Sequence, residues 1–465
     1  MVKKVSNEEN LKKSARRISI FEGASYSVSD GFGFRSVTPF LMEIAKTSKN
    51  LDMFVSFLTS IPGLFAGVAQ VFSARLMERY SRRKIVSLSV FFQALMWLAM
   101  LIPGVIYFYF QKDAEYSSAL LIIIYSLLVL AGSISGPAWS SWMKDIVTEN
   151  RGEYFAKRNR IAGFVAFIFA LIGGFLLDYF KNTKIFVAFI ILFFFSFIFR
   201  SLSAFCFTKQ YEPKFKLKDG YYFSFWEFVK KMCFNNFGRF TIFISLISFC
   251  VAIASPFFAV YMLRDLNFSY IQYFIVILIS PVITLICLPF WGRFSDKYGS
   301  FQVMKLTGIF ISLVPLLWVF TLFFRTNPLL LFSYLFIEES LSGFLWGGFN
   351  LASGNFIYFA VTRERIGICS SYFNLSNAIG VFLGATIGGF IAYLHVPFLF
   401  SSLLLVFLIS SIMRFVVYFA MIDKFNEVIP VSKFSLKDNI IEKFDEISLI
   451  FSGLKTDIFK IGIAE

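Results

Sequence analysis

The sequence predicts an all-α membrane protein with twelve transmembrane helices, arranged as two parallel six-helix bundles. The 465 residues are 57% hydrophobic and only 16% charged, and apolar runs of about 20 or more residues recur from end to end. Such a run is long enough to cross a bilayer core, and only a helix pairs all of its backbone groups internally. The second half of the chain also repeats short sequence patterns of the first half, which indicates a duplicated bundle.

The chain divides in order into five parts. We expect a cytoplasmic N-terminal segment over 1–18, one six-helix bundle over 19–207 and the other over 240–423. A linker with an amphipathic helix, 208–239, separates the bundles, and an amphipathic tail follows over 424–465. The expected membrane helices are 19–46, 51–74, 85–110, 118–143, a fifth ending near 179, 185–207, 240–263, 268–291, 302–324, 328–356, an eleventh ending near 389 and a twelfth around Arg414.

The first expected helix is the most polar of the twelve. It carries Glu22, Asp30, Arg35 and Glu43 among several serines. A helix with that many charged side chains cannot face lipid on all sides, so one face must meet water or protein.

Two polar segments carry apolar residues at helical spacing, which is typical of helices that lie on a membrane surface. One is in the linker and the other is in the tail. The apolar residues are Phe225, Trp226, Val229, Met232, Cys233 and Phe237 in the linker, and Ile440, Ile441, Phe444, Ile447 and Phe451 in the tail.

A short basic loop that follows the second helix of each half carries the clearest repeat. The stretch from Ala74 to Lys84 returns about 218 positions later as Gly292 to Gly299. Both copies read small residue, Arg, apolar residue, spacer, acid, base and Tyr. We expect these loops to have a gating role through Arg75, Glu78, Arg79 and Arg82 in the first copy, and Gly292, Arg293, Asp296, Lys297 and Gly299 in the second.

This loop resembles the one between helices 2 and 3 of the major facilitator superfamily, whose pattern is Gly-x-Leu-Ala-Asp-Arg-x-Gly-Arg-Arg. The second copy keeps Gly292, Asp296, Lys297 and Gly299. The first copy departs from the pattern, because Ala74 and Ser81 replace the glycines and Glu78 replaces Asp.

The resemblance implies two parallel halves that move against each other around a central site lined by helices 1, 4, 7 and 10. A further motif, Trp139-x-x-Trp142 followed by Arg151-Gly152, is similar to a bacterial branch of the superfamily with poorly assigned substrate. In that region we expect a charged cytoplasmic loop between helices 4 and 5 that contains Asp145, Arg151, Gly152 and Arg158.

Charged residues near the middle of helices 1 and 10 are the candidates for substrate binding or proton coupling. Charged side chains at that depth cost several kcal/mol unless paired or hydrated. Glu339 lies on one stripe with Trp346 and Asn350, which favours it over Glu338 as the cavity residue. The candidates are Tyr26, Asp30, Arg35, Glu338, Glu339, Trp346 and Asn350.

Three interpretations of these charges remain open. In the first, Arg35 and Glu339 face one cavity, an acidic or phosphorylated solute separates them, and a proton neutralises the released carboxylate. In the second, Asn350, Trp346 and Tyr26 hold a neutral sugar. In the third, the charges form a structural ion pair only.

The charge composition excludes some classes of function and indicates the membrane topology. The net charge of +15 comes from basic residues interleaved with the apolar runs, so it indicates membrane topology rather than nucleic-acid binding. The positive-inside rule places both termini in the cytoplasm. Arg200 and Arg414, at equivalent positions of helices 6 and 12, are expected to extend to the cytoplasmic surface.

Nothing in the sequence indicates an enzyme, a cofactor or a metal site. There is one histidine, His395, the five cysteines include no CxxC pair, and no phosphate-binding Gly-x-x-x-x-Gly-Lys loop occurs.

We therefore expect a secondary active or facilitative transporter, a proton-coupled symporter in the leading version. It would carry a small solute across the cytoplasmic membrane by alternating access. Its expected partners are the solute, a proton and membrane lipid, and the expected state is a monomer. The alternative is a membrane sensor or partner-binding protein of the same fold that does not transport.

Overall fold

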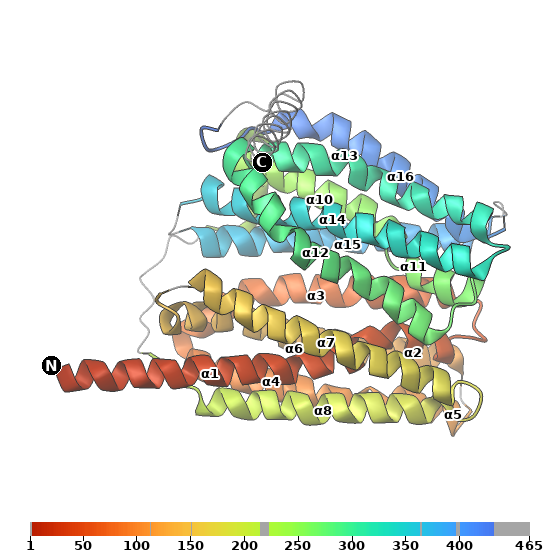
Figure 1. Ribbon diagram of the computed structural model, residues 1–465, viewed down its shortest axis with the longest axis horizontal. Coiled ribbons are helices and arrows are strands. Elements are labelled where there is room, and N and C mark those ends of the chain that lie inside the picture. Colours follow the sequence, from red (N-terminus) through yellow and green to blue (C-terminus); the bar gives the residue numbers. More distant parts are fainter. Residues whose placement is uncertain are drawn as a thin grey trace, which may run out of the picture.

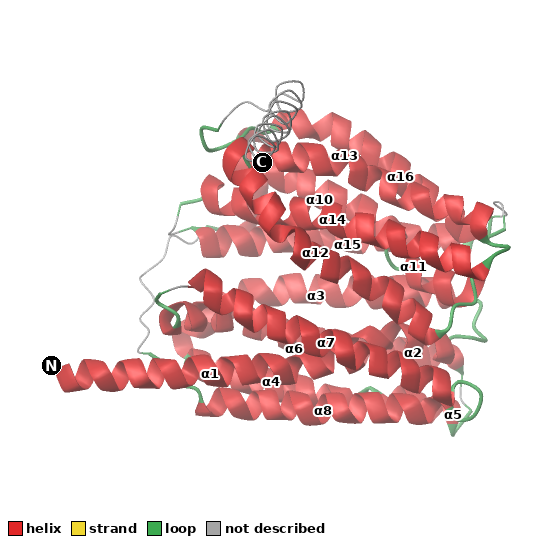
Figure 2. Ribbon diagram, in the orientation of Figure 1, coloured by secondary structure: helices red, strands yellow, loops and turns green. Residues whose placement is uncertain are grey.

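The computed structural model is helical throughout, and helices account for all the regular structure in the residues it describes (Figure 2). Those residues are 2–111, 113–149, 151–213, 223–362, 365–396 and 400–431. The side chains of residues 2–7, 74, 75, 78, 151 and 152 also lie outside the description.

The first half of the chain forms six long helical segments, some of them interrupted. They consist of α1 (Val2–Phe32) with α2 (Val37–Ile44), α3 (Leu51–Arg79), α4 (Arg82–Ala99) with α5 (Leu101–Phe108), α6 (Ala114–Ile146), α7 (Arg151–Phe180) and α8 (Ile185–Lys209).

The second half repeats this plan after the short linker helix α9 (Phe225–Lys231). Its helices are α10 (Asn236–Ala254) with α11 (Phe257–Val260), α12 (Tyr270–Tyr298), α13 (Ser300–Val319), α14 (Pro328–Ala360), α15 (Ile366–Tyr393) and α16 (Ser402–Met421).

The two halves lie side by side with their long helices running in the same general direction (Figure 1). The chain begins, the first half ends and the second half begins at one end of the molecule, which we call the termini end. The opposite end is called the distal end. The halves meet mainly through α3 against α15 and α7 against α12.

Eleven helical segments of the described chain are long and apolar enough to cross a membrane. The first helix does not meet that criterion because of its polar residues. It packs against α7 and α8 as an integral member of the first bundle (Figure 1). The predicted fold class, two parallel six-helix bundles, is confirmed.

Small residues allow the first helix to pack closely. A Cβ atom on Gly31 would lie 2.6 Å from the carbonyl oxygen of Ala166, and one on Gly33 would lie 2.5 Å from the Trp97 ring. The α-helix is interrupted at Gly33, before the shorter α2. The first helix of the second half is interrupted in the same region, at Pro256, whose ring cannot continue the helical hydrogen bonds.

The predicted surface helix of the linker is partly present as α9. Phe228 is buried beside Tyr372 of the second bundle, whereas the Trp226 side chain is 73% exposed. The predicted tail helix, from Ile440 to Phe451, lies outside the described residues.

Three charged stretches that we predicted as loops continue as helix instead. Helix α3 extends to Arg79, so residues 74–79 of the first basic loop are helical. Helix α12 extends to Tyr298, so Gly292 and Asp296 lie on its last turns. Helix α7 begins at residue 151, so Arg158 lies two turns inside a membrane helix. The turn itself is at Gly299, whose φ of +89° favours glycine.

Candidate functional site

A cavity of about 470 Å³ lies inside the first half, toward the termini end. All six helical segments of that half contribute to its walls. The polar residues that line it are Glu22, Gln70, Gln93, Ser133, Ser135, Arg158 and Arg200, and the aromatic ones are Tyr26, Phe34, Trp139 and Phe207.

Glu22, on α1, is the centre of a buried ion network. Its side chain is only 3% exposed and lies between two arginines. Arg158 Nη2 donates a hydrogen bond to Glu22 Oε2 at 2.9 Å, and Arg200 Nη1 lies 3.7 Å from Glu22 Oε1. The Ser203 hydroxyl donates to the same Oε1 at 2.7 Å. One carboxylate thus joins three helices, α1, α7 and α8.

Arg200 does not extend to the surface, so the prediction that it reaches the cytoplasmic boundary is wrong. It is 6% exposed, and its Nε donates to Gln93 Oε1 at 2.7 Å. Its Nη1 donates to Ser203, and its guanidinium carbon lies 4.5 Å from the centre of the Tyr26 ring. Partners on three helices hold this charge inside the bundle because an unpaired guanidinium there would be costly.

Arg158 reaches the network from α7 by lying against the glycine that follows Glu22. A Cβ on Gly23 would be 2.9 Å from the guanidinium carbon of Arg158, so a larger residue there would displace the end of the arginine. Arg158 Nε donates to the Ser19 carbonyl, and the guanidinium carbon lies 4.7 Å from the centre of the Trp139 ring.

Gln93 orients Arg200 and is itself held by α6. Its Nε2 donates to the Leu128 carbonyl at 3.1 Å, which directs Oε1 toward the arginine. A Cβ on Gly132 would approach that amide nitrogen to 2.5 Å, so the small residue makes room for it.

The cavity reaches the boundary between the halves at Gln70. Its Oε1 accepts a hydrogen bond from Asn374 Nδ2 of α15 at 2.8 Å. A movement of one half against the other would therefore shift Gln70 and change the wall of the cavity.

The predicted site residues of helices 1 and 10 are not brought together as an Arg35–Glu339 pair. Arg35 lies 3.7 Å from Asp30, and it makes no ion pair with Glu339 in the described chain. On α14, Trp346 packs against Phe349 and Asn350 is exposed. Tyr26 is the predicted site residue that lines the polar cavity.

Glu338, rather than Glu339, is the buried acid of the second half. It is 3% exposed, and neither of its carboxylate oxygens has a hydrogen-bond partner among the described residues. Glu339 is partly exposed. Arg414, which interacts electrostatically with Glu338, is also buried, so its predicted extension to the surface is wrong too.

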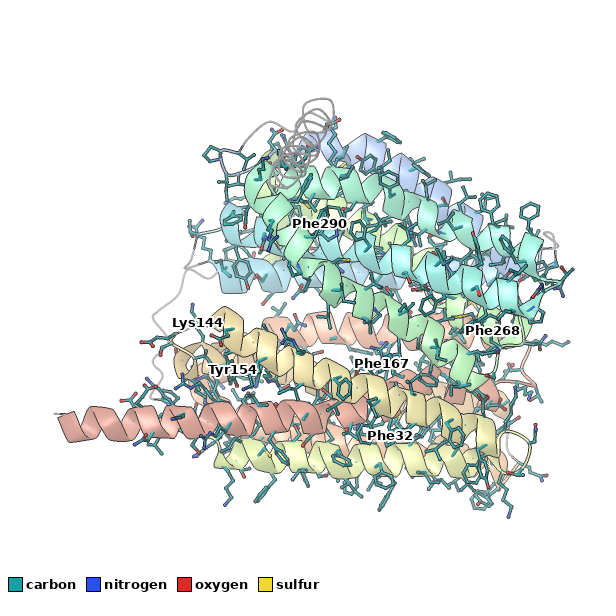
Figure 3. The ribbon with its side chains drawn as sticks, viewed as in Figure 1. Phe32, Lys144, Tyr154, Phe167, Phe268 and Phe290 are labelled. Atoms are coloured by element: carbon teal, nitrogen blue, oxygen red, sulfur yellow. The ribbon has the colours of Figure 1, made fainter. Side chains whose placement is uncertain are left out.

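The first basic loop is held by Arg82 at the termini end. Arg82 is 1% exposed, and its Nη1 donates to Asp145 Oδ2 at 2.6 Å and to the Ser141 carbonyl. Thus two predicted loop residues, Arg82 and Asp145, join α4 to the end of α6. Figure 3 labels their neighbours Lys144 and Tyr154 at this end of the molecule.

Apart from Arg158, the other charged residues of the predicted loops are exposed or lie outside the description of side chains. Arg79, Arg293, Asp296 and Lys297 are exposed, and Asp296 makes no ion pair in the described part of the chain. The side chains of Arg75, Glu78, Arg151 and Gly152 lie outside the described residues.

An acid after the last helix of each half caps the third helix of that half. The backbone N–H of Arg82 donates to Glu212 Oε1 at 2.9 Å, and that of Phe301 donates to Glu427 Oε2 at 2.8 Å. The N-terminus of a helix leaves N–H groups unpaired and favours a carboxylate. The acids are 215 positions apart, so the repeat extends to these caps.

Charged contacts also join the two halves at the distal end. Arg264 Nη1 donates to Asp52 Oδ1 at 2.9 Å. Asp178 accepts the first two backbone N–H groups of α12, both at 2.8 Å, and the Tyr270 hydroxyl donates to Glu43 at 2.6 Å.

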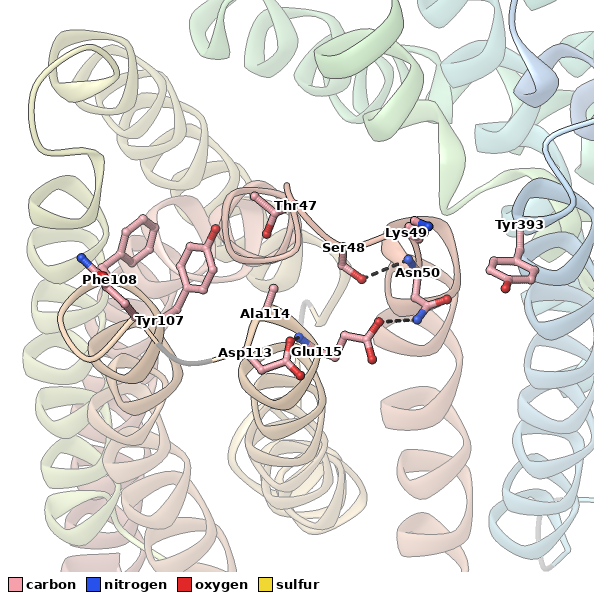
Figure 4. Close-up of a pocket in the computed structure, with 11 residues that line it drawn as sticks. Thr47, Ser48, Lys49, Asn50, Tyr107, Phe108, Asp113, Ala114, Glu115 and Tyr393 are labelled. Atoms are coloured by element: carbon pink, nitrogen blue, oxygen red, sulfur yellow. Dashed lines mark hydrogen bonds between the residues drawn. The ribbon is translucent and has the colours of Figure 1, made fainter.

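A second, larger hollow of about 810 Å³ lies among the distal loops (Figure 4). Asn50 donates to Glu115 Oε1 at 2.6 Å across it, and Tyr393 is the lining residue from the other half. Most of its lining side chains are exposed, so it is a loop surface rather than an enclosed site.

Sequence reasoning missed Glu22, Gln93 and Arg200 as a site. The signal was present in part, since Glu22 lies on the most polar helix and Arg200 has an equivalent in Arg414. Gln93 carried no signal, because a single amide in an apolar run does not indicate its partner. In the described residues no cluster of His, Cys, Asp and Glu could hold a metal ion.

Comparison with solved structures gives transporters of one fold. A crystal structure of a mutant of the nucleoside transporter NupG matches with a TM-score of 0.66 at 14% identity, over 90% of this chain and 100% of that one. A bacterial homologue of the iron transporter ferroportin in an inward-facing state matches at 0.63, with 11% identity, over 89% and 98%. Its outward-facing state gives 0.57, with 11% identity, over 88% and 99%. The search of curated proteins gave no match.

A family model covers most of the chain as well. It is described as Major Facilitator Superfamily and matches residues 24–385, which include most of both bundles and the cavity residues from Tyr26 to Phe207. With the duplicated six-helix plan, this match leads to one conclusion: the chain belongs to the Major Facilitator Superfamily.

Proposed function

We propose that this protein is a secondary transporter that moves a small solute across the cytoplasmic membrane by alternating access, with both termini in the cytoplasm. The substrate site is the cavity of the first half. The observation that carries the proposal is the buried Glu22–Arg158–Arg200 network. The space beside this network is an open cavity rather than being filled by side chains.

Depth supports this assignment. Arg158 is 7 residues from the start of α7, and Arg200 is 9 residues from the end of α8. At about 1.5 Å per residue, both lie roughly 10–14 Å from the termini end. Charges that deep are costly, and in membrane proteins they usually mark solute or ion paths.

The direction of opening is supported by the ends of the molecule. At the distal end Asp52–Arg264 and Asp178 hold the halves together, whereas Asp296 at the termini end is exposed and makes no ion pair with a described residue. The ferroportin homologue matches better in its inward-facing state. We therefore assign this conformation as open toward the cytoplasm.

Proton coupling, in this proposal, depends on Glu338. A buried carboxylate with no hydrogen-bond partner in the described chain is a candidate proton carrier, because burying it charged costs far more than burying it neutral. Glu338→Gln should then leave binding intact and remove the pH dependence of flux, while Glu339→Gln keeps it. A Glu338→Gln protein that still pumps in response to a pH gradient would exclude this role.

Flux measurements in proteoliposomes test the function. A solute mixture should be taken up by the wild type and by Arg414→Met, and not by Arg200→Met, with equal amounts of folded protein in each sample. If no solute crosses in any variant while ligands still bind, the protein is a sensor or partner-binding protein instead.

A further inference from the structure

We propose that the solute carries an oxyanion, a carboxylate or a phosphate, that binds between Arg158 and Arg200 on the cavity side of Glu22. This inference rests on the proposed function, because it assigns the substrate class of the same cavity.

Charge is the first reason. Two guanidinium groups share the single carboxylate of Glu22, so the network carries one net positive charge. The side chains of Arg158, Arg200 and Glu22 are 13%, 7% and 3% exposed, so solvent screens this charge weakly. An anion entering the cavity would neutralise it, whereas a metal cation would be repelled.

Unused hydrogen-bond donors are the second reason. Arg158 bonds through Nε and Nη2, and Arg200 bonds through Nε and Nη1. Arg158 Nη1 and Arg200 Nη2 make no hydrogen bond to any described residue, and neither nitrogen is fully buried. Each guanidinium therefore has one N–H₂ group still available in the cavity wall.

The geometry of the pair suits one small group. Both guanidinium groups already reach opposite oxygens of the same carboxylate, Glu22. A second carboxylate or phosphate can bridge them from the open side, since oxyanions accept from two arginines at once. The guanidinium carbons of Arg200 and Arg158 lie over the faces of the Tyr26 and Trp139 rings, 4.5 Å and 4.7 Å from the ring centres, which adds cation–π contacts to the site.

The rest of the cavity fits an organic body rather than a bare ion. Phe34 and Phe207 add apolar surface, and the indole N–H of Trp139 is a buried donor without an acceptor among the described residues. A solute with an oxyanion at one end and an apolar or ring portion would use both features.

Matched pairs of probes test this proposal on the purified full chain in detergent. The pairs are phenylacetate and phenylacetamide, phenyl phosphate and phenol, and glucose 6-phosphate and glucose. At least one anion should raise the unfolding temperature by about 4 °C while its neutral partner does not. The pairs that respond distinguish a carboxylate from a phosphate.

Variants locate the effect. The stabilisation should be lost in Arg158→Gln and weakened in Trp139→Phe, which removes only the indole N–H. It should persist in Arg414→Gln, the equivalent arginine of the second half. Trp139→Phe keeps the test available if the arginine variant does not fold.

The outcomes separate this inference from the proposed function. If neutral members stabilise as well as anions, if no pair responds, or if Arg158→Gln keeps the response, the oxyanion site is wrong. Uptake of a neutral solute blocked by Arg200→Met would overturn the inference and leave the transport function standing. Anion binding without anion flux would support the oxyanion site and overturn the proposed transport function.

Discussion

The two halves place an arginine at the same position of their last helices, Arg200 and Arg414, and surround it differently. Arg200 is bonded to the side chain of Gln93 and to Ser203 beside a cavity. Arg414 donates to the backbone carbonyl of Ile311, and its Nε has no partner in the described chain. Ile311 lies 218 positions after Gln93, so the two arginines face equivalent points of equivalent helices.

This difference shows how a duplicated bundle can assign separate roles to its copies. In the first half, polar side chains and glycines leave a polar cavity around the charge. In the second half, the aromatic rings of Phe243, Phe349 and Tyr418 belong to the core that surrounds the equivalent level. The fold tolerates a buried arginine in both places, and Arg200 lies in the wall of a polar cavity.

The largest expected effect is from removing Glu22, the buried acid of the first half that is ion-paired to two arginines. Glu22→Gln leaves two buried guanidinium groups without their carboxylate, and we expect a loss of about 3–5 kcal/mol in stability. Unfolding in detergent measures it. The double variant Glu22→Gln with Arg158→Gln should recover part of the loss, and additive losses would show that the two groups are not coupled.

Next in size is the contrast between the arginines themselves. Arg200→Met should reduce flux at least tenfold, and Arg414→Met should retain it. Because Arg414 makes one hydrogen bond within the described chain, to the Ile311 carbonyl, while Arg200 bonds to Gln93 and Ser203 and lies beside Glu22, replacing Arg414 should cost less stability than replacing Arg200. Flux and melting temperature measured on both variants decide this. Equal loss of flux would mean that the halves contribute alike.

The fold could be predicted from the sequence because it depends on patterns longer than a helix. Runs of apolar residues predict the number and order of the spans, and the basic stretch that returns about 218 positions later predicts the duplication of the bundle. The site could not be predicted in the same way. The link from Glu22 to Arg158 and Arg200 spans 136 and 178 positions, and no local pattern shows which charges share a cavity.

The prediction that Arg200 extends to the surface, made from its position near a helix end, was wrong for a physical reason. Arg200 lies near a helix end, where a long side chain usually extends to water. The Gln93 amide and the Glu22 carboxylate supply partners inside the bundle, so the inward orientation is available and satisfied. Arg35 makes an ion pair at 3.7 Å with Asp30, which lies just before the interruption at Gly33, instead of the predicted pair with Glu339 of the other half.

A third, intermediate effect compares the two ends instead of the two halves. Asp52→Asn removes an ion pair that joins the halves in this conformation and should favour opening of the distal end by about 1–2 kcal/mol. Asp296→Asn should act in the opposite direction or have little effect, since Asp296 pairs with no described residue here. Cysteine labelling from each side measures both, and identical labelling in Asp52→Asn would show that the pair does not gate.

The smallest expected effect concerns a feature that the two halves share, the acid that caps the third helix of each half. Glu212→Gln and Glu427→Gln each weaken the cap of a third helix and should cost about 1 kcal/mol apiece. The Glu212 variant should cost slightly more, because Glu212 also lies 3.6 Å from Arg82 Nε. Thermal unfolding of the two variants checks this order.

The contact between α3 and α15 has a mechanical consequence. Ser56 donates to the Ala385 carbonyl, and a Cβ on Gly67 or Gly389 would approach the facing helix within 2.8 Å or 2.6 Å. Backbones this close cannot slide past each other without collision, but one can rotate about their shared line of contact. In the proposed alternating-access cycle, we expect this helix pair to act as a pivot axis. We expect a substitution such as Gly67→Val to loosen this contact, because the larger side chain would collide with Ala378 and Leu375 of the facing helix.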